Sequence, residues 1–210
     1  MRRAIVVVLA VLVLCGVGVL WHWHSSSRSQ VKAPSTIGDY VGTGPRVAVI
    51  GDSITFLSVD AINAALRPRF APGITAVIGI KTDAQLVTAK RYAATHPDIV
   101  VIDLGTNDVT QHDAFESYRH ELGSMVGLFP QSCVVVTTIT THTPGDDAFA
   151  QRAAKYNEYL RTFPHVADWD AVVGQALQAG QHILTDLVHP NPAGQRLYAG
   201  LVAQAVSACH

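Results

Sequence analysis

A serine that follows an apolar run is the first reactive side chain to consider in this chain. Ser53 comes after VAVI (47–50), Gly51 and Asp52, where a buried strand would end and a helix could begin. A serine in such a place serves as a helix N-cap, as part of a phosphate-binding turn, or as a catalytic nucleophile. The triplet Gly-Asp-Ser is compatible with all three roles.

The stretch TDLVHPNPAGQRLYAG (185–200) contains the base that a nucleophilic serine would need. Asp186 and His189 lie three residues apart, just before the last predicted helix. At that spacing a carboxylate can reach the imidazole Nδ1–H, fix the tautomer and orient Nε2 toward a nucleophile. Other histidines have no carboxylate at comparable spacing within a motif, and we interpret them as surface residues: His112, His120, His142, His165 and His182.

Alternating apolar runs and helical patterns predict the elements that would position these side chains. Continuous β-branched runs are typical of strands buried on both faces of a parallel sheet, here at 47–50, 74–78, 99–104, 133–139 and, more weakly, 165–169. Helix-like segments lie between and after them, at about 59–66, 84–95, 114–128, 148–161 and 192–207. The pattern predicts an α/β domain with right-handed crossovers.

In such a domain, ligands bind at the carboxyl ends of the strands. Ser53 follows the end of the first predicted strand, and GTND (105–108) follows the end of the third. We therefore expect both segments at the same edge of the sheet, although about fifty residues separate them.

Three blocks in this order, GDSIT (51–55), LGTND (104–108) and DLVHPNPAGQRLYA (186–199), resemble the SGNH (GDSL-type) hydrolase family. The resemblance covers about residues 46–207. It implies a flavodoxin-like three-layer α/β/α sandwich with a mostly parallel five-stranded sheet. It also implies a serine esterase or acyl hydrolase that needs no metal or organic cofactor.

By this resemblance, Ser53 is the nucleophile, His189 the general base and acid, and Asp186 the partner that orients His189. The side-chain amide of Asn107 and the backbone N–H of Ser53 would donate to the oxyanion. One preorganised donor of this kind contributes about 2.7–4 kcal/mol to the transition state.

The second block of the family is where this sequence departs. The family places a glycine there whose N–H is a third oxyanion donor, whereas this chain reads VIGIKTDAQL (77–86). We favour Gly79 for this donor; the alternatives are a backbone N–H near Thr82 or an oxyanion hole with two donors. We interpret Lys81 as a solvated surface residue rather than a reader of anionic substrates.

The remaining polar residues near these motifs have structural interpretations. Asp52 and Asp108 are expected to form turns and hydrogen bonds, and Asp103 lies in an apolar run and needs a buried partner. The segment THTPGDD (141–147) follows the fourth predicted strand and could shape the acyl or alcohol pocket.

The N-terminus predicts a separate segment. Arg2 and Arg3 precede seventeen uncharged residues, 4–20, and Trp21 and Trp23 follow as an interfacial belt would. We interpret residues 1–24 as a membrane anchor with a cytoplasmic N-terminus; a signal peptide cleaved near 25–27 is the alternative. Residues 25–44 form a predicted linker and 45–210 the domain, which would lie outside the cytoplasm.

Two cysteines of the predicted domain, Cys133 and Cys209, fall toward the end of the sheet opposite the Ser53 edge. An exported domain allows disulfides to persist, and we predict that these two are bonded. The formal net charge of −1 gives no reason to expect nucleic acid as a partner.

The sequence therefore predicts an exported serine esterase that acts through an acyl-Ser53 intermediate on a small-molecule or glycan ester. Short acyl groups, such as acetyl on a cell-envelope glycan, are favoured because no lid segment is evident. Two alternatives stay open: an O-acyltransferase with the same three residues, and a non-catalytic binding domain on this fold.

Overall fold

The computed structural model describes residues 31–209. The predicted anchor or signal segment, its hydrophobic helix and the first part of the predicted linker lie outside the described residues. Within residues 31–209, no helix combines the length and the apolar character needed to cross a bilayer.

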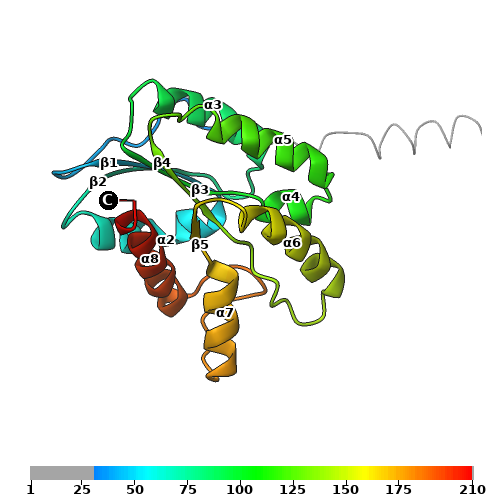
Figure 1. The fold of residues 1–210 in the computed structure, drawn as a ribbon. Coiled ribbons are helices and arrows are strands. Elements are labelled where there is room, and N and C mark those ends of the chain that lie inside the picture. Colours follow the sequence, from blue (N-terminus) through cyan, green and yellow to red (C-terminus); the bar gives the residue numbers. More distant parts are fainter. Residues whose placement is uncertain (1–30, 210) are drawn as a thin grey trace, which may run out of the picture. The chain divides into compact units, whose positions relative to one another are not determined.

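Five parallel strands form one sheet in the order β2-β1-β3-β4-β5 (Figure 1). Their bounds are β1 Arg46–Gly51, β2 Ala71–Ala76, β3 Ile99–Asp103, β4 Cys133–Thr137 and β5 His165–Ala167. The central strands are buried on both faces, as continuous apolar runs require. This confirms the predicted α/β fold with a five-stranded sheet.

Helices cover both faces of the sheet and make the predicted three layers. The helices described are α2 Ser53–Leu66, α3 Thr82–Ala93, α4 Thr106–Thr110, α5 Phe115–Val126, α6 Asp147–Leu160, α7 Trp169–Gln178 and α8 Pro192–Ser207. In Figure 1, α3, α5 and α6 lie above the sheet and α2, α7 and α8 below it. Alternate residues of one strand face the two layers: Ala48 and Ile50 join the upper core, Val47 and Val49 the lower.

The elements differ from the predicted ones at several places. Helix α2 begins at Ser53 rather than at about residue 59, because the Asp52 cap starts it directly after β1. The second strand covers 71–76 rather than 74–78; as the edge strand of the sheet it accommodates Pro72. Helix α7 was not predicted, although Asp168 caps it by accepting a hydrogen bond from the Ala171 N–H. Helix α4 has five residues, too few for a periodic signal.

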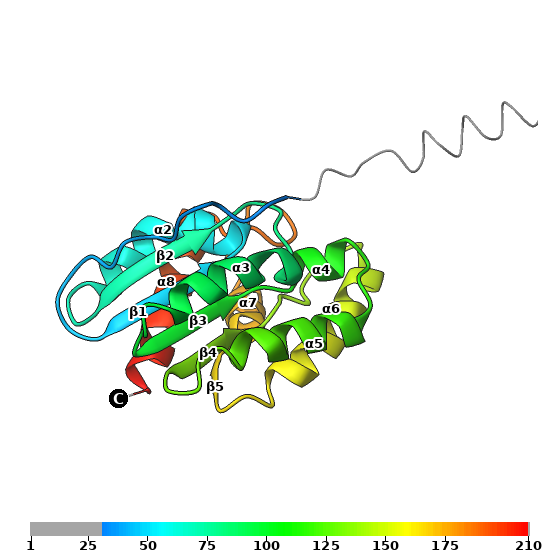
Figure 2. The same ribbon diagram turned by 90° about the horizontal axis from the view of Figure 1, so that it is seen from above.

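The described part of the predicted linker lies along the edge strand β2, as Figure 2 shows in blue. The N–H of Val41 donates to the Pro72 carbonyl at 3.1 Å, and the N–H of Gly38 donates to Thr75 Oγ1 at 2.9 Å. Tyr40 packs on Tyr92 with ring centroids 6.0 Å apart. These contacts protect an edge that would otherwise be open to pairing with another chain.

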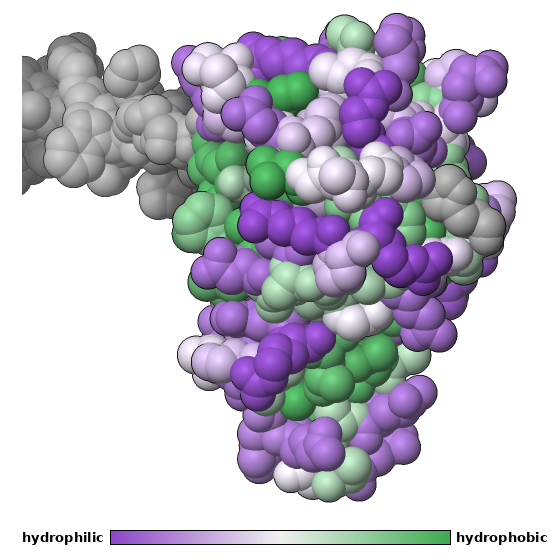
Figure 3. All heavy atoms as spheres, turned by 90° about the vertical axis from the view of Figure 1, so that its left-hand side faces the viewer, coloured by the Kyte–Doolittle hydropathy of each residue, from purple (hydrophilic) through white to green (hydrophobic). Residues whose placement is uncertain are grey.

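Cys133 at the start of β4 and Cys209 after α8 form a disulfide, with Cα atoms 5.9 Å apart. The bond ties the C-terminal end to the amino ends of the strands. Figure 3 shows the side of the molecule on which Figure 1 marks the C-terminus; hydrophilic residues there surround only small hydrophobic patches.

Candidate active site

Ser53 is the first residue of α2, two residues beyond the end of β1. The carboxylate of Asp52 accepts a hydrogen bond from the Ile54 N–H at 2.9 Å and so caps the helix. A Cβ on Gly51 would lie 2.2 Å from Thr55 Oγ1, so only glycine fits this strand-to-helix turn. Ser53 itself is 4% exposed.

His189 contacts Ser53 across 136 positions of sequence. Its Nε2 lies 2.9 Å from Ser53 Oγ, and its Nδ1 lies 2.7 Å from Asp186 Oδ2. The predicted nucleophile, base and orienting carboxylate thus form one hydrogen-bonded row. Because Nδ1 faces a carboxylate, the imidazole tautomer with the proton on Nδ1 leaves Nε2 free to accept the serine proton.

The loop that carries Asp186 and His189 is fixed by its own hydrogen bonds. Thr185 N–H donates to the His189 carbonyl at 2.8 Å, closing the loop just before α8. Asp186 Oδ1 accepts the N–H groups of Val188 and His189, both at 2.8 Å. Partial burial of Asp186 opposes ionisation, but these N–H groups and the His189 ring outweigh it and lower the pKa of Asp186 below its usual range.

Asn107 comes to the same edge from α4, after the end of β3. Its Nδ2 donates to Asp52 Oδ2 at 3.1 Å, so one of the two amide N–H groups anchors the side chain beside Ser53. The turn into α4 requires Gly105, which has φ +123° and whose Cβ would lie 2.8 Å from Ile139 Cδ1. The second amide N–H of Asn107 can donate to a substrate oxygen.

Gly79 and Thr82, the two positions weighed for the third donor, have different surroundings. The Thr82 N–H faces the Asp108 carboxylate, 3.3 Å from both oxygens, and Thr82 Oγ1 donates to Asp108 Oδ2 at 3.0 Å. Gly79 has φ +77° in the loop between β2 and α3. Among the residues that the structure describes, no acceptor is hydrogen-bonded to the Gly79 N–H.

Residues just after α4 hold this loop, and the sequence analysis did not identify them. Lys81 Nζ pairs with Asp113 Oδ2 at 2.7 Å, and Gln111 Nε2 lies 3.5 Å from the Gly79 carbonyl. Lys81 is therefore paired and partly buried rather than freely solvated. Neither Gln111 nor Asp113 belongs to a motif, so only the spatial contact identifies them.

A buried carboxylate lies behind the row of hydrogen-bonded side chains. Asp103 accepts hydrogen bonds from Thr55 Oγ1 and Thr137 Oγ1, both at 2.6 Å, which supply the buried partners that the sequence required. Burial raises the pKa of Asp103; burial and the nearby Asp103 raise the pKa of Asp52 well above its usual range. Burial thus disfavours the ionised forms of Asp52 and Asp103 in the folded protein.

A hollow of ≈ 330 Å³ adjoins the loop that carries His189. Its lining comes from α4, from the segment after β4 with the start of α6, and from the loop before α8: Thr110, Thr143, Asp146, Phe149, Asp186, Leu187 and Val188. Two of these residues fall in segment 141–147, which therefore does border a cavity beside the candidate site.

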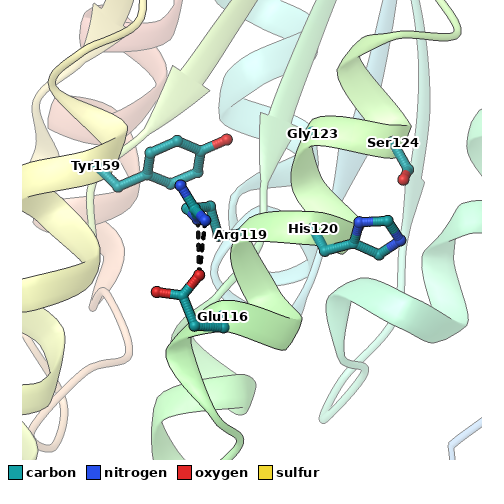
Figure 4. A pocket seen from close by; sticks show the side chains of 6 residues that line it. All are labelled: Glu116, Arg119, His120, Gly123, Ser124 and Tyr159. Atoms are coloured by element: carbon teal, nitrogen blue, oxygen red, sulfur yellow. Dashed lines mark hydrogen bonds and ion pairs between the residues drawn. The ribbon is translucent and has the colours of Figure 1, made fainter.

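A second hollow, of ≈ 480 Å³, lies over α5 and α6 (Figure 4). Its lining includes the ion pair between Glu116 and Arg119 and the side chains of His120 and Tyr159. None of the predicted site residues borders it.

One group of possible metal ligands occurs among the described residues. Atoms of Cys133, His165 and Cys209 lie within 4.8 Å of one another. Because the two cysteines are bonded to each other, they offer no thiolate to an ion in this form.

A row of serine, histidine and aspartate at the carboxyl edge of a parallel α/β/α sheet is the arrangement that serine hydrolases use. The GDSL-like lipase/acylhydrolase family model matches residues 49–197, which include all three side chains. The chain belongs to this family, which confirms the resemblance inferred from the sequence blocks.

Solved structures show the same fold. A lipolytic protein of the G-D-S-L family from Veillonella parvula is 20% identical, with a TM-score of 0.69 over 77% of this chain and 98% of that one. The C-terminal catalytic domain of Streptococcus pneumoniae peptidoglycan O-acetyltransferase A, with a methylsulfonyl adduct, is 25% identical, with a TM-score of 0.57 over 80% and 96%.

A mutant of an acetyl-xylooligosaccharide esterase from Geobacillus stearothermophilus is 20% identical, with a TM-score of 0.61 over 81% of this chain and 96% of that one. No curated protein sequence matches this chain significantly.

Proposed function

We propose that this protein is an exported serine esterase that hydrolyses carboxylic esters through an acyl-Ser53 intermediate. The observation that carries the proposal is the 2.9 Å contact between Ser53 Oγ and His189 Nε2, with Asp186 2.7 Å behind the imidazole. A serine hydroxyl becomes a nucleophile when a base at this distance takes its proton.

In the first half-reaction, His189 Nε2 accepts the Ser53 proton while Oγ bonds to the carbonyl carbon of the ester. The oxyanion would be bound by the N–H of Ser53, the free amide N–H of Asn107 and the N–H of Gly79. The N-terminus of α2 adds its positive dipole end at Ser53. His189 then donates the proton to the departing alcohol, and the acyl group stays on Ser53.

In the second half-reaction, water attacks the acyl-serine while His189 accepts a proton from it. His189 then returns the proton to Ser53 Oγ as the bond between the acyl carbon and Oγ breaks, and the carboxylic acid leaves. We place part of the substrate in the ≈ 330 Å³ hollow beside Asp186. Its size accommodates a short acyl group or a single small ring. The esterase among the structural neighbours acts on acetyl-xylooligosaccharides, which is consistent with a small acyl group.

The test is a chain-length series of aryl esters with the full chain and with Ser53→Ala. We expect hydrolysis to be fastest with short acyl groups and to fall at least ~10³-fold in Ser53→Ala. The matched control is Ser58→Ala, a buried serine on the same helix α2. Undiminished hydrolysis in Ser53→Ala would reject Ser53 as the nucleophile.

The pH dependence tests His189. Acid converts its imidazole to imidazolium, which cannot accept the serine proton, so kcat/KM should fall on acidification. The pKa of Asp186 is lowered, so Asp186 remains ionised while this happens. We expect kcat/KM to fall on the acid side of the pH–rate profile; a rate that does not fall on acidification would contradict His189 as the base.

An O-acyltransferase is the second candidate, favoured by the pneumococcal neighbour, which is a peptidoglycan O-acetyltransferase domain. The same acyl-Ser53 would then pass its acyl group to a sugar hydroxyl instead of water. Adding glycan oligosaccharides to the ester assay distinguishes the two: an acylated glycan product indicates transfer, and unchanged acid release indicates hydrolysis.

The proposed export rests on the sequence of residues 1–24 and on the disulfide of the domain, since disulfides persist in oxidising compartments. A fractionation of cells that express the full chain tests it. Protein in the membrane fraction whose domain is accessible to external protease would support an anchored, exported enzyme.

A further inference from the structure

Large apolar side chains are exposed around the candidate active site. Phe56 and Leu57 are 48% and 39% exposed, Ile78 55% and Leu187 41%. Val31, the first described residue, is 38% exposed. We call these five residues the apolar rim.

Each member of the apolar rim is close to a residue of the candidate site. Phe56 and Leu57 lie three and four residues after Ser53, roughly 5–6 Å along the axis of α2. Ile78 precedes Gly79, and Leu187 lies two residues before His189. A Cβ placed on Gly79 would be 3.7 Å from Val31 Cγ2, so the described chain begins at this same edge.

The charged groups near the apolar rim do not form a basic patch. Lys32 lies beside Val31, but Lys81 is neutralised by Asp113, and Asp83 and Asp186 are carboxylates. A partner for this surface is therefore expected to be apolar rather than strongly anionic.

The sequence that precedes Val31 indicates which apolar partner fits the apolar rim. Residues 4–20 carry no charge, and only residues 21–30 separate them from Val31. Those ten residues span at most about 35 Å when fully extended. If residues 4–20 lie in a bilayer, the edge that carries Ser53 is the part of the domain with the shortest path to the lipid surface.

We propose that the apolar rim docks on a phospholipid bilayer, so that the mouth of the candidate active site faces the lipid surface. This inference rests on the proposed export and anchoring. It also specifies where the substrate of the proposed esterase must lie. Esters at or next to the membrane surface would reach Ser53, and esters far from it would not. Docking by apolar side chains also predicts little dependence on anionic lipid or on salt.

The docking is tested by fluorescence, independently of catalysis. In a full chain with Cys15→Ser, where Cys133 and Cys209 are bonded to each other, Ile78→Cys carries an environment-sensitive NBD label. The matched control is Val41→Cys, which is 47% exposed but lies against Pro72 at the opposite end of β2. Both proteins are reconstituted in phosphatidylcholine vesicles with and without lipids that carry a shallow doxyl quencher.

We expect the label at position 78 to be quenched by the doxyl lipids and the label at 41 to be unaffected. Equal quenching at the two positions, or none at 78, would overturn the proposal. Quenching at 78 that required phosphatidylglycerol or vanished at high salt would also overturn it, because charge and not apolar contact would then drive docking.

A kinetic comparison then links docking to substrate access. The variant Leu57→Ser/Ile78→Ser should hydrolyse an ester embedded in vesicles about tenfold more slowly, while hydrolysis of a soluble aryl ester stays unchanged. The control Val41→Ser/Leu177→Ser removes two side chains of similar exposure, 47% and 38%, outside the apolar rim and should behave as wild type.

The two proposals fail in different ways. Absence of hydrolysis on every ester, with quenching at position 78, would reject the esterase and leave the docking intact. Equal loss on soluble and embedded esters in the rim variant would reject the docking and leave the esterase intact.

Discussion

Asn107 has two amide N–H groups with different uses. One donates to Asp52 at 3.1 Å, which holds the side chain in place before any substrate arrives. A donor that is already oriented loses no free energy in reorganisation when charge develops on the substrate oxygen. Asp52, which caps α2 and anchors Asn107, thus links the position of the oxyanion donor to that of Ser53.

We predict that Asn107→Ala lowers kcat on an aryl ester by about 10²–10³-fold with little change in KM, because the lost contact forms only in the transition state. Asn63→Ala, on α2 but away from the site, is the control and should retain full activity. A change in KM alone would show that Asn107 binds substrate and not the oxyanion.

The loop between β2 and α3 connects backbone conformation with the chemistry of the site. Gly79 has φ +77°, a conformation that costs an L-residue roughly 1–2 kcal/mol. A Cβ there would meet only Val31, at 3.7 Å, so packing does not forbid a larger residue. The ion pair between Lys81 and Asp113 and the contact of Gln111 with the Gly79 carbonyl hold the loop in this conformation.

The variant Gly79→Ala separates the effect of Gly79 on backbone stability from its effect on catalysis. Gly180, at φ +70° after α7, has open space around it and is a matched control. We expect both alanine variants to lose about 1–2 kcal/mol of unfolding free energy, and only Gly79→Ala to lose kcat, by tenfold or more. If kcat is unchanged in Gly79→Ala, the oxyanion hole has only the Ser53 and Asn107 donors.

Asp108 on α4 accepts hydrogen bonds from Thr82 at the start of α3. The contribution of Asp108 to the free energy of unfolding depends on pH. Burial raises the pKa of Asp108 to about 7, above the usual value for an aspartate. Between about pH 4 and 7 the native protein therefore binds more protons than the unfolded chain. The contribution of Asp108 to stability must fall as pH rises through this window.

We predict that Asp108→Asn flattens this decline. Urea unfolding at several pH values should show wild type losing roughly 2–4 kcal/mol more than the variant between about pH 4.5 and 7.5. Asp52 and Asp103 are present in both proteins, so the difference between the two curves reports Asp108 together with its electrostatic coupling to Asp52. Parallel curves would show that Asp108 stays ionised throughout.

Stability of the domain as a unit depends on the disulfide at its C-terminal end. Cys133 and Cys209 are 76 positions apart, and α8 carries much of the lower core between them, including Tyr198 and Val202. Closing a loop of that length reduces the entropy of the unfolded chain by an amount worth about 4 kcal/mol at 25 °C.

We predict that Cys133→Ser/Cys209→Ser lowers the free energy of unfolding by up to about 4 kcal/mol and leaves kcat unchanged, because the bond lies at the end of the sheet opposite Ser53. Denaturation of wild type with and without reductant should reproduce the difference. A variant as stable as oxidised wild type would mean that α8 is held by packing alone.

The boundaries of the elements show how far sequence patterns reach. The start of α8 at Pro192 was predicted where it occurs, because proline at the first helical position and the Asn191 cap are local signals. The start of β2 was missed because Pro72 and Gly73 argue against a strand, and the edge position that tolerates them is not a local property. Helix α7 was missed although its cap, Asp168, and its apolar spacing could have identified it.

The sequence alone determined the fold class, the family, and the side chains that would do the chemistry. The apolar periods of strands and helices are local patterns, and the three blocks are recognised from residue types and their spacing within short stretches of the chain. The tertiary structure decided which groups contact each other: that Nε2 of His189 lies 2.9 Å from Ser53 Oγ, that Asp52 anchors Asn107, that Asp108 occupies the Thr82 N–H, and that apolar side chains surround the site. Those contacts join positions far apart in the chain, and their distances follow only from how the two layers of helices pack on the sheet.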